Sequence, residues 1–122
     1  VSDKYAMRGT SDEKPDFSTL LSYGNESVML EKLIAETEKE MQAVSSAERR
    51  KDLQELDVLT HHLRSSWEIL RADQPLRELY KLLHESAAPD HEALSNAVTA
   101  VLDMGSEIIR LAKKERRKYN NG

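Results

Sequence analysis

The chain has 122 residues, enough for one small domain, and its 39% hydrophobic residues allow a single modest core. The absence of cysteine excludes disulfide scaffolds, thiolate metal sites and cysteine nucleophiles, and favours a reducing, cytoplasmic setting. A formal net charge of −4 argues against general nucleic-acid binding. No apolar run approaches the roughly 18 residues that a membrane-spanning helix needs, so we expect no membrane contact by this segment.

The first third of the chain predicts a lead-in and two helices. Residues 1–14 are polar and unpatterned, which is typical of a linker or a disordered lead-in. An apolar cluster at residues 17–21 has the spacing of a short helix. A second helix is predicted from Asn25, which can cap it, to about Val44.

The rest of the chain predicts three more helices and no strand. The longest starts at Ser45–Ser46 as a cap, has Glu48 in the place of a capping-box acid, and continues through Arg71. The others cover about 75–86 and 90–118, and residues 119–122 are expected to be a disordered tail. Amphipathic helices joined by short loops predict an all-α fold, an antiparallel up-down four-helix bundle over residues 15–118 with an additional short N-terminal helix.

The strongest candidate for chemistry lies in the middle of the longest predicted helix. On a helical wheel of about 100° per residue, His61 lies almost opposite the apolar side, and His62 lies on the flank. Arg64 follows one turn later, and Ser65 is small enough to leave the imidazole uncovered. An exposed imidazole beside a cation suits transient attachment of an anionic group such as phosphate. The alternative is an ordinary surface histidine.

The segment 60–85, THHLRSSWEILRADQPLRELYKLLHE, resembles the histidine-containing phosphotransfer (HPt) domain of multistep two-component signalling. The family's central motif is His-x-Leu-Lys-Gly-Ser, and this chain matches it directly at His61, Leu63 and Ser66. Arg64 stands at the motif's lysine, which keeps the cation, and Ser65 stands at its glycine. The resemblance covers about residues 16–115 and is strongest over 57–86.

Two further positions depart from the family pattern. Arg71 replaces the usual glycine before Ala72, and Trp67 is bulky where the family often has a small residue. The wheel places Trp67 in the core, so we expect altered packing there and no interference with the histidine. The serine at position 65 could slow transfer, or it could mark a domain that binds receivers without relaying phosphate.

The resemblance implies a mechanism in which His61 accepts a phosphoryl group from a receiver-domain aspartate and passes it to another receiver. It implies that Arg64 favours the phosphoryl charge and that Ser65 leaves access to the imidazole. The receiver would supply the magnesium ion, so no cofactor or metal is expected on this chain. The domain would have no autonomous kinase activity and would be part of a cytoplasmic or membrane-bound hybrid sensor kinase.

Side chains around His61 are predicted to form the surface on which a receiver docks. Three of them are apolar residues that the wheel turns away from the core, and two are acidic: Val58, Ile69, Ala72, Asp57 and Glu68. The alternative is that the three apolar residues are isolated surface positions, which are common.

The sequence also allows other interpretations of function and site. The chain could be a non-catalytic interaction module that binds a receiver or a helical partner without phosphorylation. His62 is a rival acceptor, although the residue two positions after it is Arg64 and not leucine. His84 and His91 flank a turn, but two histidines without a carboxylate at a fixed spacing are weak evidence for a metal site. The basic run at 113–118 is expected to be the solvated end of a helix.

Overall fold

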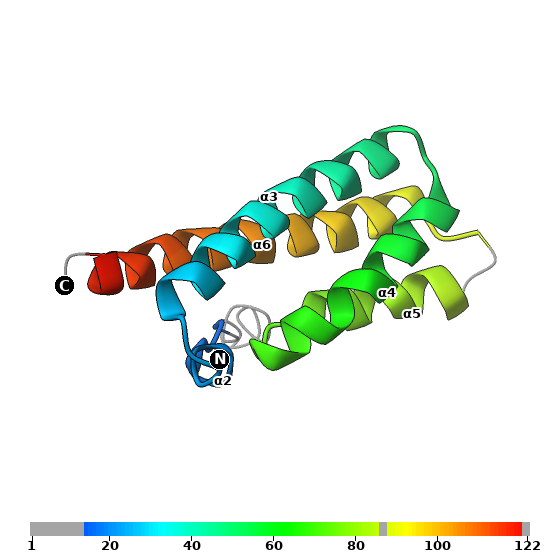
Figure 1. Cartoon of the computed structure of the whole chain (residues 1–122). Helices are drawn as coiled ribbons and strands as arrows, with labels where there is room; N and C mark the ends of the chain where they lie inside the picture. The colour runs from blue at the N-terminus through cyan, green and yellow to red at the C-terminus, as the bar shows by residue number, and fades with distance from the viewer. Residues whose placement is uncertain (1–13, 86–87, 121–122) are drawn as a thin grey trace, which may run out of the picture.

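The computed structural model describes residues 14–85 and 88–120, which form five α-helices and no strand (Figure 1). The helices are α2 (Ser18–Leu21), α3 (Glu26–Arg49), α4 (Leu53–Ile69), α5 (Gln74–Glu85) and α6 (His91–Asn120). The predicted all-α class is therefore confirmed for this part of the chain. The predicted lead-in lies outside the described residues except for Lys14.

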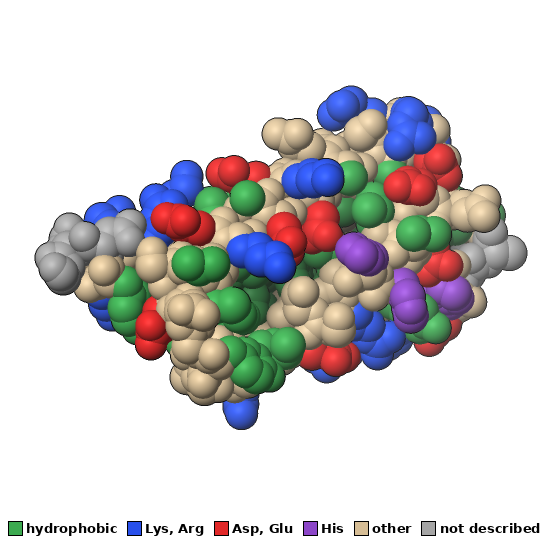
Figure 2. All heavy atoms as spheres, viewed as in Figure 1, with side chains coloured by type: hydrophobic (Ala, Val, Ile, Leu, Met, Phe, Trp, Pro, Cys, Tyr) green, Lys and Arg blue, Asp and Glu red, His purple; other side chains and the backbone are tan. Residues whose placement is uncertain are grey.

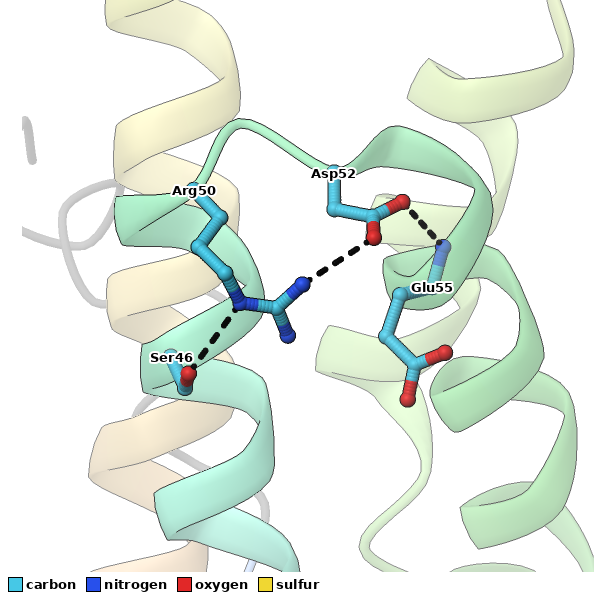
Figure 3. Close-up of polar contacts among 4 residues, drawn as sticks. All are labelled: Ser46, Arg50, Asp52 and Glu55. Carbon is cyan, nitrogen blue, oxygen red and sulfur yellow. Dashed lines mark hydrogen bonds and ion pairs between the residues drawn. The ribbon is translucent and has the colours of Figure 1, made fainter.

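The helix ends differ from the sequence prediction at the junction of α3 and α4. The break predicted near Ser45 does not occur, because α3 continues through both serines to Arg49. The chain turns at Lys51, whose φ of 56° lies in the left-handed region. Asp52 then caps α4, with a carboxylate oxygen that accepts a hydrogen bond from the Glu55 N–H at 3.0 Å (Figure 3).

Asn25 also behaves differently from its predicted role. It occupies the cap position of α3, but its φ of 53° is left-handed and its side chain makes no capping hydrogen bond. The negative charge of Glu26 in the first turn instead favours the helix dipole. At the start of α6, the Asp90 carboxylate accepts a hydrogen bond from the Ala93 N–H at 3.1 Å.

The helices pack as two neighbouring pairs that together form a helical bundle. The long helices α3 and α6 lie side by side along most of their length, and the shorter α4 and α5 form the second pair (Figure 1). The pairs are joined by contacts of α4 with α3 and of α5 with α6. The short helix α2 lies near the end of α4 and contacts α3.

The core lies between helices α3 to α6 and is mostly aliphatic. Its largest member, Trp67 on α4, is only 1% exposed, and every long helix contributes to the same cluster. A smaller cluster of Leu30, Ile34 and Ala112 lies between α3 and α6. Phe17 packs against both clusters, and the Asp16 N–H donates to the Leu70 carbonyl oxygen at 2.7 Å. The segment before α2 is thereby tied to the end of α4.

The last helix is longer than predicted and carries the basic run on its surface. It includes Tyr119 and Asn120, which the sequence assigned to a disordered tail. Lys113 and Lys118 are exposed, and they lie 3.8 Å and 3.1 Å from carboxylate oxygens of Glu38 and Glu115. Among the described residues, no helix combines the length and apolar character needed to cross a membrane.

Candidate phosphohistidine site

The candidate site lies on α4, a helix whose two ends are both held by polar contacts. At its start, the Arg50 guanidinium bridges the junction, with Nη1 3.1 Å from an Asp52 carboxylate oxygen and Nε 3.4 Å from the Ser46 hydroxyl (Figure 3). At its end, the Ala72 N–H donates to the Trp67 carbonyl at 2.9 Å, and the Arg71 N–H donates to the Glu68 carbonyl at 3.0 Å. This pattern is a Schellman motif, which satisfies the last carbonyls of the helix.

His61 is exposed in the middle of α4, as the wheel predicted. Thr60 and Leu63 beside it are each 2% exposed, and the Thr60 hydroxyl donates to the Leu56 carbonyl at 2.7 Å. Within the described part of the chain, the His61 imidazole forms no hydrogen bond and no ion pair. Ser65, one turn further on, is also exposed. The imidazole is therefore open to a partner and rigidly supported from behind.

Arg64 does not simply extend into solvent beside His61. Its guanidinium carbon lies 5.4 Å from the centroid of the Tyr80 ring on α5, within the range of a cation–π contact. Its Nε lies 3.4 Å from a Glu68 carboxylate oxygen, and 39% of the side chain remains exposed. The guanidinium is therefore held between Tyr80 on α5 and Glu68 on its own helix.

The contact with α5 continues beyond Tyr80. The Tyr80 ring stacks on the His84 imidazole, with centroids 4.1 Å apart and planes inclined by 27°. His84 Nε2 then lies 2.8 Å from a carboxylate oxygen of Asp57 on α4. Asp57, one of the predicted docking residues, thus has a partner on the neighbouring helix.

The predicted docking residues are not all on the surface. Val58 is 55% exposed and Ile69 is 37% exposed, and Glu68 is exposed as well. Ala72, however, is 0% exposed and belongs to the main core cluster, so its assignment to a docking surface was wrong. The wheel failed there because α4 ends at Ile69 and the left-handed Arg71, with φ of 58°, turns Ala72 inward.

The rival acceptor His62 faces α3. Its side chain is 71% exposed, and its Nε2 lies 3.4 Å from a carboxylate oxygen of Glu40. The two residues line a shallow hollow between α3 and α4 together with Glu36, Lys39, Ala43 and Leu59. Burial raises the pKa of the Glu40 carboxyl above its usual value, and Glu36 adds to that effect, whereas His62 and Lys39 oppose it.

Histidines gather on the side of the molecule where α4 and the end of α5 lie, among acidic and basic side chains (Figure 2). No group of three histidine or carboxylate side chains within residues 14–85 and 88–120 could hold a metal ion. His84 contacts Asp57, and His91 lines a separate hollow with Glu48 and Leu53.

Sequence reasoning missed Tyr80 and the role of His84. Their spacing of four residues on a helix predicts that they are neighbours, but it does not tell which helix they face. That information depends on the packing of α4 against α5.

Comparison with known proteins gave no further assignment. No family model matches the chain, and no similar curated protein or solved structure was found.

Proposed function

We propose that this chain is a phosphotransfer domain in which His61 accepts a phosphoryl group from a receiver-domain aspartate and delivers it to another receiver. The observation that carries the proposal is the environment of His61: an exposed imidazole without a partner among the described residues, on a rigid helix, beside a restrained cation. The exposed Val58 and Ile69, one before and one after His61 on α4, are separate apolar side chains that a docking partner would contact.

In the proposed reaction, the neutral His61 imidazole attacks the phosphorus of an aspartyl phosphate on the receiver. An N–P bond forms, the acyl phosphate P–O bond breaks, and the aspartate leaves as a carboxylate. In the second transfer, the carboxylate of another receiver attacks the phosphorus, and the imidazole leaves. Arg64 favours the charge of the transferred group, and the small Ser65 leaves room for it. The receiver supplies the magnesium ion, and this chain has no kinase activity of its own.

The proposal includes the arrangement and the setting of the domain. Helices α3 to α6 form an antiparallel up-down four-helix bundle, with α2 across one end. The contacts of α3 with α4, α4 with α5, α5 with α6 and α6 with α3 support this order. The domain works in the cytoplasm as part of a hybrid sensor kinase, and its partners are receiver domains.

A second candidate is a non-catalytic module that binds a receiver or a helical partner without phosphorylation. One observation favours it: Glu68 lies 3.4 Å from the Arg64 guanidinium and partly neutralises the cation that a phosphoryl group would need. In this case Val58 and Ile69 would contribute to binding, while His61 would remain unmodified.

Transfer from a radiolabelled phosphorylated receiver tests the proposal. The wild type and the His62→Ala variant should gain a label that acid removes and base does not, and the His61→Ala variant should gain none. Persistent labelling of His61→Ala, with loss in His62→Ala, would move the acceptor to His62. Receiver binding without labelling of the wild type would favour the non-catalytic module.

A further inference from the structure

Arg64 is restrained by contacts on two sides. The face of the Tyr80 ring lies 5.4 Å from its guanidinium carbon, and a Glu68 oxygen lies 3.4 Å from its Nε. Neither contact is a hydrogen bond, and the guanidinium donates none to another residue of the described part of the chain. Because its Nε is buried, the donors left for a phosphoryl group are those of the two terminal nitrogens, and the two contacts limit where these nitrogens lie.

The Tyr80 ring has a contact of its own on α5. It stacks on His84 with centroids 4.1 Å apart, and His84 Nε2 lies 2.8 Å from an Asp57 oxygen. Asp57, His84, Tyr80 and Arg64 therefore form a continuous ladder that leaves α4, follows α5 for one turn and returns to α4. We call these four residues the α4–α5 ladder.

The ladder passes directly beside His61. Asp57 and Arg64 occupy the positions four before and three after His61, and such residues are neighbours on a helix surface. A phosphoryl group on His61 would therefore lie next to the end of the ladder that carries the guanidinium. Without these contacts, the Arg64 side chain would sample many rotamers in solvent. Holding its guanidinium beside the phosphoryl group would then cost conformational entropy.

We propose that Tyr80 is a positioning residue that holds the Arg64 guanidinium beside the phosphoryl group on His61. This inference rests on the proposed function, because it needs a phosphoryl group at His61. It adds a residue of α5 to a site otherwise built from α4. The aromatic ring, and not the tyrosine hydroxyl, is the part that acts, since the cation lies over the ring.

Phosphoramidate tests this role without a receiver. The imidazole attacks its phosphorus, the N–P bond of the reagent breaks, ammonia leaves, and a new N–P bond forms on the histidine. The rate at which His61 is labelled is measured for the wild type, Tyr80→Leu and Tyr80→Phe. The same three proteins are then measured with the additional substitution Arg64→Gln. Tyr23→Leu serves as a matched control, because Tyr23 is 66% exposed and lies outside the ladder.

Tyr80→Leu should slow labelling of His61 about threefold, the size expected for an exposed cation–π contact. Tyr80→Phe and Tyr23→Leu should match the wild type. In the Arg64→Gln background, Tyr80→Leu should cause no further loss, since the cation that Tyr80 holds is gone. Thermal unfolding of each variant is recorded alongside, and a general folding defect would lower the rate in both backgrounds.

Two results would overturn the inference alone: equal rates for Tyr80→Leu and the wild type, or an equal loss with and without Arg64. In both, His61 is still labelled and the proposed function stands. If the wild type takes up no more label than His61→Ala, the proposed function fails, and the positioning role of Tyr80 fails with it.

Discussion

The exposure of the His61 imidazole follows from its register on α4. Thr60 and Leu63 are both buried, so α4 cannot rotate to cover His61 without bringing one of them into solvent. Periodicity of the sequence alone predicts this outcome. The contact of Arg64 with Tyr80 could not be predicted in the same way, because it joins residues of two different helices.

Arg71 leads to a prediction about the free energy of unfolding. Its φ of 58° is left-handed, a conformation that is unfavourable for a residue with a Cβ and that glycine adopts freely. Arg71→Gly should therefore raise the free energy of unfolding by about 1 kcal/mol. Chemical denaturation measures the change. As a control, Arg50→Gly should lower stability, because Arg50 lies one position before the left-handed Lys51 at the end of α3 and has a right-handed φ of −84°, where glycine brings no relief of strain. A loss of stability in Arg71→Gly would contradict the assigned backbone conformation.

Glu40 leads to a prediction about pH. Burial raises the pKa of its carboxyl above 4.5, so the native state binds more protons than the unfolded state just above that pH. The contribution of Glu40 to stability is therefore greatest below its ordinary pKa and is lost as the pH rises through the native value. Glu40→Gln should remove this dependence.

The comparison is made in a His62→Ala background, because a charged His62 would otherwise pair with the ionised carboxylate. Denaturation between about pH 4 and pH 6 measures it. The stability of the Glu40 protein relative to Glu40→Gln should fall with rising pH. A relative stability that rises over this range would show that the carboxylate, not the acid, is favoured in the native state.

At the scale of elements, the helices themselves were predictable and their ends were not. The sequence predicted a break at Ser45–Ser46, because serine followed by Glu48 resembles a capping box. The real junction has no glycine or proline, and the left-handed Lys51 closes α3 there. One signal was present, since Asp52 precedes Glu55 with the same capping spacing and does cap α4.

The pairing of α3 and α6 leads to a further prediction. Gly105 is buried on α6, and a Cβ added there would lie 2.6 Å from Met41 Cγ and also against its sulfur. Gly105→Ala should therefore lower the free energy of unfolding by about 1 kcal/mol, since Met41 must move. In a Met41→Ala background the same substitution should raise it by about 0.5 kcal/mol, because alanine favours the helix. An unchanged effect of Gly105→Ala in the two backgrounds, measured by denaturation, would contradict the close approach.

At the scale of the whole molecule, the class of fold was predictable from composition and amphipathic spacing, and the all-α structure confirms it. The candidate site was predictable only in part. The exposed positions of His61, Val58 and Ile69 follow from one helix, whereas the burial of Ala72 depends on where that helix ends. The ladder depends on the packing of α4 against α5, which a single-helix pattern does not contain.

The packing of the molecule also explains how a small surface site can be rigid. The buried Trp67 anchors α4 in the main core cluster, and the hydrogen bond from Asp16 to Leu70 ties the segment before α2 to the end of that helix. His61 therefore projects from a supported element, which keeps the imidazole in place for an approaching partner.

The most direct test is to follow the four histidine side chains by proton–nitrogen correlation spectroscopy while a phosphorylated receiver is added. If His61 is the phosphoryl acceptor, its imidazole nitrogens change to a phosphorylated state. His62, His84 and His91 should keep the states they have before addition. Phosphorylation of any of these three with His61 unchanged, or binding of the receiver with no phosphorylated histidine, would contradict phosphoryl transfer to His61.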